Sequence, residues 1–192
     1  YPLKDIPTTS LLFSIFQLFV SQEKLQKKGV NEFYHKDVVR FLKHQSVYKL
    51  LSDNNSSLVD NFTEEIGKEN YIFINKDQIE TILKDAAVEV KNSISSIFNS
   101  YTTINEFLDR ILNLIHLLKE DVTDLEKEYL FRFYTAFTQL KTLQTAYEYF
   151  TDLKTLSLFF KQLITSETLS FQGEPLRGLQ LMGMLETRVL DF

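Results

Sequence analysis

The sequence contains no cysteine and no tryptophan, and it has only three prolines and five glycines among 192 residues. Without cysteine, the chain has no disulfide bond, no thiolate metal ligand and no cysteine nucleophile. The scarcity of proline and glycine, which interrupt helices, favours long helices. Because a reducing cytoplasm suits a protein without cysteine, we expect a cytoplasmic location.

Long hydrophobic runs and the common catalytic motifs are also absent. The longest apolar run, at positions 11–20, is about half as long as a membrane-spanning helix requires, so we expect no membrane contact. The sequence has neither of the glycine-rich loops that bind phosphate groups, and it has no Gly-x-Ser-x-Gly nucleophile motif. These absences exclude the commonest nucleotide-binding loops and the nucleophile elbow of the α/β-hydrolases from this chain.

The titratable residues that most often build active sites are scattered. His35 and His44 would lie on opposite sides of a helix, and His116 is far away in the sequence, so we predict no metal site. Paired acids occur where solvated carboxylates are ordinary, and these pairs are Glu64 with Glu65 and Glu126 with Glu128. We therefore predict no catalytic residue, no cofactor and no small-molecule substrate for this segment.

The formal net charge is −5, but it is unevenly distributed. From Gln22 to Lys49, seven basic residues oppose three acidic ones, whereas the chain from Leu50 onward carries a net charge of −9. A nucleic acid would be expected to bind the basic N-terminal quarter. The acidity of the rest argues against strong nucleic-acid binding by this chain alone.

Apolar residues recur at helical spacing through most of the sequence, which predicts an all-α, irregular domain of about eight helices that spans residues 1–192. Residues 31–34 are expected to form a turn, and residues 71–74 an isolated extended segment or a small strand. Capping boxes at Thr103 and Thr123 mark two helix starts. The broad apolar pattern of residues 123–150 predicts a central, mostly buried helix. The expected helices are 10–28, 35–45, 58–68, 75–87, 88–99, 103–120, 123–150 and 153–165.

One row of basic residues is a candidate binding surface. Lys36, Arg40 and Lys43, here called the basic row, recur at positions i, i+4 and i+7 of one helix, and Lys27 and Lys28 precede them. Tyr34 and Tyr48 flank the row and would be able to stack on bases. We predict DNA binding at these five basic residues. The alternative is an ordinary solvated helix face.

The C-terminal tail, residues 173–192, differs in composition from the rest of the chain. It holds three of the five glycines, and its apolar run at 179–184 predicts a buried strand. Glu186, Thr187 and Arg188 follow as a polar turn, which either faces a cleft or forms a local surface ion pair. Because the chain stops on an apolar Phe192, we expect a domain excised from a larger protein.

Three stretches resemble one protein family. The tail Leu-Gln-Leu-Met-Gly-Met-Leu-Glu-Thr-Arg-Val-Leu-Asp-Phe at 179–192 resembles AddB-type helicase–nuclease subunits, in particular PD-(D/E)xK nuclease family proteins from Bacteroidetes. Tyr-Pro-Leu-Lys-Asp-Ile-Pro at 1–7 is similar to a stretch after helicase motif IV, with Ile6 in place of the usual threonine. Residues 33–44 are similar to a third family stretch, and Gln45 replaces its proline. Together the three stretches cover about a fifth of the chain.

The resemblance implies a place within a larger protein. The chain would be the helical insertion between motifs IV and V, equivalent to the 2B domain of a UvrD-like helicase, and the tail would belong to the helicase-like core. The parent would be a DNA helicase and exonuclease subunit that acts in double-strand-break repair and recombination. This segment would be non-catalytic and would contact DNA and the partner helicase subunit.

The resemblance also implies a role for the polar turn of the tail. Glu186, Thr187 and Arg188 would lie at the nucleotide-binding cleft of the parent and form its candidate cofactor-binding residues. The alternative to a domain of a helicase–nuclease subunit is a free-standing helical protein-interaction module without a nucleic-acid role.

Overall fold

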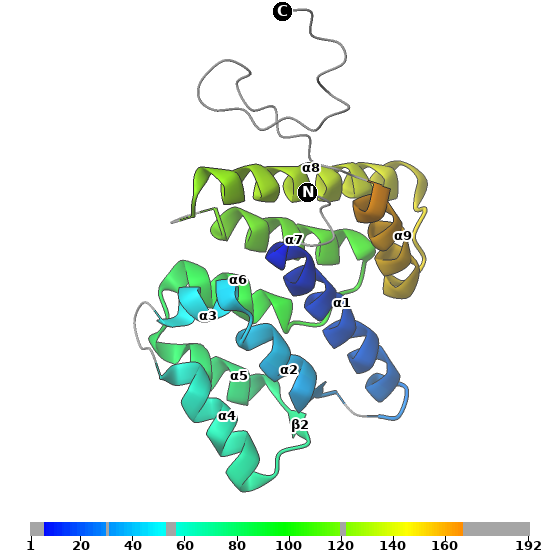
Figure 1. Cartoon of the computed structure of the whole chain (residues 1–192). Helices are drawn as coiled ribbons and strands as arrows, with labels where there is room; N and C mark the ends of the chain where they lie inside the picture. The colour runs from blue at the N-terminus through cyan, green and yellow to red at the C-terminus, as the bar shows by residue number, and fades with distance from the viewer. Residues whose placement is uncertain (1–5, 30, 53–56, 120–121, 167–192) are drawn as a thin grey trace, which may run out of the picture.

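The structure is a computed structural model, and it describes residues 6–29, 31–52, 57–119 and 122–166. Within these ranges the chain forms nine α-helices, a short 3₁₀ helix and a two-stranded sheet (Figure 1). The all-α, multi-helix architecture is confirmed. The helices are α1 (Pro7–Gln26), α2 (His35–Leu42), α3 (Gln45–Ser52), α4 (Leu58–Glu69), α5 (Lys76–Ile82), η2 (Leu83–Asp85), α6 (Val88–Ile97), α7 (Ile104–Leu117), α8 (Asp124–Tyr147) and α9 (Leu153–Ser166).

The sheet joins two distant parts of the sequence. Strand β1 (Phe33–Tyr34) pairs antiparallel with β2 (Phe73–Ile74), and Phe33 lies opposite Ile74. The small strand at 71–74 is confirmed, whereas the turn predicted at 31–34 is wrong. A two-residue strand has no periodicity to reveal it, and here the partner strand supplies its backbone hydrogen bonds.

Side-chain caps begin four of the predicted helices, and the capping residues are Asn75, Thr103, Thr123 and Asp152. The box at Thr123 is complete, because the Glu126 side chain also accepts the Thr123 backbone N–H at 2.9 Å. Thr103 caps α7, but Glu106 reaches back to the Thr102 N–H at 2.8 Å, one residue earlier than predicted. These bonds hold the pKa values of Glu106 and Glu126 below their ordinary range.

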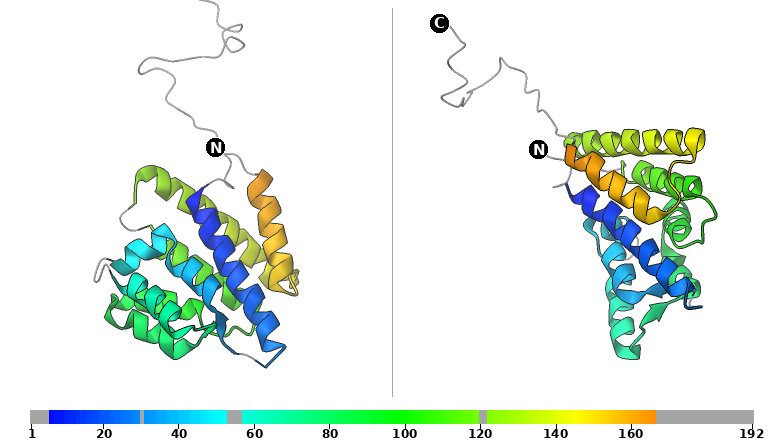
Figure 2. Two further views of the ribbon diagram at one scale, coloured as in Figure 1. Left: turned by 60° about the horizontal axis from the view of Figure 1, so that its bottom comes forward. Right: turned by 90° about the vertical axis from the view of Figure 1, so that its right-hand side faces the viewer.

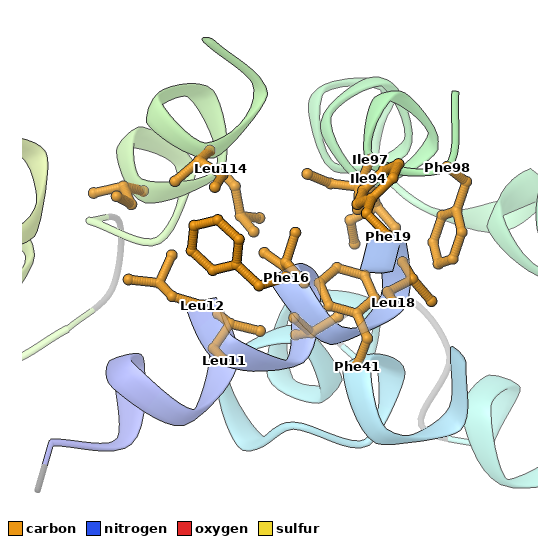
Figure 3. Close-up of a cluster of buried hydrophobic side chains, with 14 of the residues drawn as sticks. Leu11, Leu12, Phe16, Leu18, Phe19, Phe41, Ile94, Ile97, Phe98 and Leu114 are labelled. Carbon is orange, nitrogen blue, oxygen red and sulfur yellow. The ribbon is translucent and has the colours of Figure 1, made fainter. Parts of the chain in front are cut away.

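Helix α1 is the centre of the core. Its apolar side chains point in several directions, and Leu11, Leu12, Ile15 and Phe19 are all inaccessible to solvent. Figure 3 shows side chains of α1, among them Leu12 and Phe19, between α2 on one side and α6 and α7 on the other. A helix that is apolar on most of its circumference must be covered by neighbours on most sides, so α1 positions the helices around it.

Helix α8 was predicted to be central and mostly buried, and this prediction is wrong. Figure 1 shows α8 along one edge of the molecule, where it packs on α7 and buries Phe133, Phe137 and Leu140. Its other face exposes Phe131 at 56% and Tyr147 at 76% of their surface. The broad apolar pattern did not predict the burial of α8 correctly, because leucine and aromatic residues also occur singly on protein surfaces.

His44 links the start of α1 to the end of α2. Its Nε2 lies 3.0 Å from both the Pro7 carbonyl oxygen and the Ser10 hydroxyl, and its Nδ1 lies 3.4 Å from the Ser46 N–H. The Ser46 N–H points at Nδ1 as at an acceptor, which suits the neutral ring. Burial lowers the pKa of His44, and the hydrogen bond to Pro7 opposes this effect in part.

We expect the protein to lose stability as pH falls below the ordinary histidine pKa of 6.5. The unfolded chain then takes up a proton that the folded state resists, so the free energy of unfolding decreases until the lowered pKa is reached. Urea unfolding at neutral and mildly acidic pH would measure this. The loss on acidification should be smaller in His44→Gln than in the control His116→Gln. Equal losses in both variants would contradict the role of His44.

Candidate nucleic-acid interface

The basic row occupies the outer face of α2. Lys36, Arg40 and Lys43 are all exposed, while α2 buries Val38 and Phe41 against the core. The helical spacing seen in the sequence therefore does place the three cations on one solvent-facing side of the helix. A row of this kind has the charge and the accessibility that phosphate contacts require.

Two members of the basic row have acidic neighbours. The Arg40 Nη1 lies 3.0 Å from the Asp37 Oδ1, and the Lys43 Nζ lies 3.3 Å from the Asp60 Oδ1. In the described ranges, Lys36 has no carboxylate partner. The Lys43–Asp60 pair is about half exposed on both sides, and exposed pairs of this kind contribute little to stability. A phosphate would therefore be able to replace Asp60 at Lys43 at little cost.

Lys27 and Lys28 lie far from Lys43, the last residue of the basic row. Both are exposed just after the end of α1. Helices α1 and α2 run antiparallel, because Pro7 at the start of α1 contacts His44, which follows α2. Helix α1 is about 30 Å long at 1.5 Å per residue, so Lys43 lies at the opposite end from Lys27 and Lys28. The five basic residues therefore do not form a single cluster.

The two tyrosines named from the sequence lie in different environments. Tyr48 donates a hydrogen bond of 2.7 Å to the Asp60 carboxylate, which raises the pKa of Tyr48 and lowers that of Asp60. Tyr34 is half-buried in β1, with its ring 4.8 Å from that of His35. Tyr34 also lines a groove, and this location makes it the better candidate for contact with a base.

The groove, here called the α1 groove, lies between α1, α2 and α9 and has a volume of about 850 Å³. Figure 2 shows α1 between α2 and α9, so α1 forms its floor and the other two helices its walls. The wall on the side of α2 carries Tyr34 of β1 with Asp37 and Arg40 of α2. The α9 wall carries Lys154, Ser157 and Leu158. The floor is one helical stripe of α1, made of Ser10, Phe13, Ser14, Phe16, Gln17, Val20 and Ser21.

Sequence reasoning missed this groove, although part of its signal was present. Ser10, Ser14, Gln17 and Ser21 recur at i, i+4, i+7 and i+11 within a stretch that is otherwise apolar. Polar residues at that spacing mark one stripe of the helix, on which Ser14 is buried and Ser10 and Gln17 are exposed. No sequence pattern connects this stripe to Lys154, because only the tertiary packing brings α9 beside α1.

Asp37 is the most buried charged residue of the groove. Its surface is 4% exposed, its Oδ1 accepts a hydrogen bond from Arg40, and its Oδ2 has no hydrogen-bond partner among the described residues. A carboxylate in this position is stabilised chiefly by the adjacent guanidinium. Asp37 therefore fixes the orientation of Arg40 at the edge of the groove.

The remaining sequence predictions concern other parts of the chain. Glu186, Thr187 and Arg188, together with the whole tail at 173–192, lie outside the described residues. No group of three metal-ligating side chains occurs in the described part of the chain, where His35 contacts the Ile72 carbonyl through Nδ1 at 3.0 Å. None of the described helices has the length and hydrophobicity needed to cross a membrane.

Comparisons with protein-family models, with curated proteins and with solved structures find no match to this chain. The candidate interface therefore has to be judged on its own geometry. That geometry is a solvent-facing row of cations on α2, next to a groove that is lined by both polar and apolar side chains and has a further lysine on its opposite wall.

Proposed function

We propose that this chain is a non-catalytic, cytoplasmic helical domain of a DNA helicase–nuclease subunit that acts in double-strand-break repair and recombination. Its role would be to contact DNA and to hold the partner helicase subunit. The observation that carries the DNA contact is the exposed basic row of Lys36, Arg40 and Lys43 along α2. The parent protein is proposed from the resemblance of the tail and of two N-terminal stretches to AddB-type subunits.

Electrostatics support a weak contact that depends on salt. The basic segment from Gln22 to Lys49 is embedded in a chain of net charge −5. Asp37 and Asp60 also offset part of the charge of the basic row. The domain would therefore add phosphate contacts to a larger interface, and most of the affinity would come from the parent.

Neutralising the basic row should weaken DNA binding. In Lys36→Gln/Arg40→Gln/Lys43→Gln, each lost phosphate contact is expected to flatten the slope of log affinity against log salt by about 0.9. Fluorescence anisotropy between about 50 and 200 mM salt would measure both the slope and the affinity. It should be done on this chain and on the intact parent.

The matched control removes three exposed lysines from elements that carry no part of the basic row: Lys68→Gln/Lys76→Gln/Lys84→Gln. The control changes the net charge equally, so a general effect of charge would appear in both triple variants. Unchanged affinity of the basic-row variant at low salt would exclude this DNA contact.

A second candidate function, the protein-interaction module, is favoured by the exposed apolar side chains of α8. Phe131, Leu143 and Tyr147 are exposed along this helix, and Thr135, Thr138 and Thr142, between them in the sequence, bond their hydroxyls to the carbonyl oxygens four residues earlier. Exposed aromatic side chains are typical of protein contacts. In the first proposal, this α8 surface is the place for the partner subunit. If the chain and its parent show no salt-dependent DNA binding, the interaction module becomes the better hypothesis.

A further inference from the structure

We propose that the α1 groove binds a single strand of nucleic acid, with its phosphates held between α2 and α9. This inference rests on the proposed DNA contact and deepens it, because it names the form of nucleic acid and adds a second element to the interface. It depends on three properties of the groove, which are its shape, the cations on its two walls and the aromatic rings within it.

The shape of the groove suits a chain one strand wide. From Ser10 to Ser21 its floor extends over about 16 Å at 1.5 Å per residue. Three of the seven floor residues are serines, and the space between the walls has a volume of about 850 Å³. A duplex would contact the outer edges of α2 and α9, whereas a single strand would be able to lie on the floor.

The cations lie on both walls. Arg40 uses one of its five N–H donors for the Asp37 Oδ1 at 3.0 Å, and the others stay available for phosphate oxygens. Lys154 is exposed on α9, and no carboxylate of the described residues pairs with it. Asp37 is the only acidic residue in the described lining, and Arg40 already pairs with it.

The lining also offers stacking and hydrogen-bonding groups. The rings of Tyr34 and Phe13 are both only partly buried and lie on different sides of the groove. Exposed aromatic rings beside a basic track are the usual means of binding single strands without sequence preference. Ser157 adds a half-exposed hydroxyl on the α9 wall, next to Lys154 in the lining.

The experiment compares a fluorescein-labelled oligothymidylate with a hairpin duplex of similar length, on the full chain at low salt. Lys154→Glu should weaken binding of the single strand about tenfold and flatten its salt slope by about 0.7. Its effect on the duplex should be less than about twofold. Lys84→Glu, which changes the same charge on an exposed lysine of η2, is the control and should leave both affinities unchanged.

A second variant tests the groove without a change of charge. Ser157→Trp fills the space above the α1 floor and should weaken binding of the single strand but not of the duplex. Because the chain has no other tryptophan, the emission of this residue also reports directly on a strand that enters the groove. Circular dichroism of each variant checks that the helices remain folded.

The outcomes separate this inference from the proposed function. If the basic-row variant loses DNA binding while Lys154→Glu and Ser157→Trp bind the single strand normally, the DNA contact stands and the groove inference is overturned. Equal weakening of single strand and duplex by Lys154→Glu also overturns it, because the lysine would then contact a duplex from the edge. If the wild-type chain and its parent bind neither probe, both proposals fail.

Discussion

Replacement of Phe160 by alanine is expected to lower the free energy of unfolding by about 3–5 kcal/mol. Phe160 is inaccessible to solvent, and it anchors α9 to two other helices. Its ring lies 5.6 Å from Phe13 and 5.8 Å from Phe16 on α1, and 4.8 Å from Phe137 on α8, measured between centroids. The substitution would remove all three contacts and leave a cavity where the three helices meet.

Urea denaturation followed by circular dichroism would measure this loss. The matched control is Phe131→Ala, which deletes the same side chain from a position that is 56% exposed on α8. The control should change the free energy of unfolding by no more than about 0.5 kcal/mol. Similar losses in the two variants would mean that α9 does not pack on α1 as described.

The second large effect is expected at Gln144, a buried polar residue near the end of α8. Its Oε1 accepts the Phe150 N–H at 2.7 Å, and its Nε2 donates to the Phe150 carbonyl oxygen at 3.1 Å. The side chain thus satisfies both backbone groups of a buried residue in the turn before α9. In Gln144→Leu both groups lose their partner, at about 1–3 kcal/mol for each.

The control for Gln144→Leu is Gln139→Leu, which makes the same change at an exposed position of the same helix. Thermal or urea unfolding compares the two variants. Hydrogen exchange at the Phe150 amide provides a local readout, because this N–H should exchange faster once the Gln144 side chain is gone. A protected Phe150 amide in Gln144→Leu would show that another group had replaced the glutamine, and the predicted loss would then be wrong.

Local signals made most of the helices predictable from the sequence. The capping box at Thr123 begins α8 where expected, because it depends only on two residues three positions apart. The burial of α8 was not predictable in this way, since the same apolar stripe suits a central helix or a surface helix with exposed aromatic residues. Likewise, β1 exists because β2 pairs with it, and the pairing partner is 40 positions away.

The candidate site was also predictable only where its residues belong to one helix. The basic row of Lys36, Arg40 and Lys43 was visible because one helix carries all three cations. Lys154 could not be predicted as part of the site from the sequence. It lines the same groove as Arg40 only because α9 and α2 pack on opposite sides of α1. The pairing of Arg40 with buried Asp37 also depends on how deeply the core covers that carboxylate, which the sequence does not state.

The pairing of β1 with β2 has a consequence for how this chain can vary in length. His35 and Ile72 are 37 positions apart, yet the N–H of the first donates to the carbonyl of the second at 3.1 Å. The chain between them, which carries α2, α3 and α4, therefore returns to the point where it started. Because the entropic cost of closing a loop grows only slowly with its length, relatives of this protein would tolerate insertions between α3 and α4. The helices that pack on α1 would keep their places while the connection between α3 and α4 changed in length.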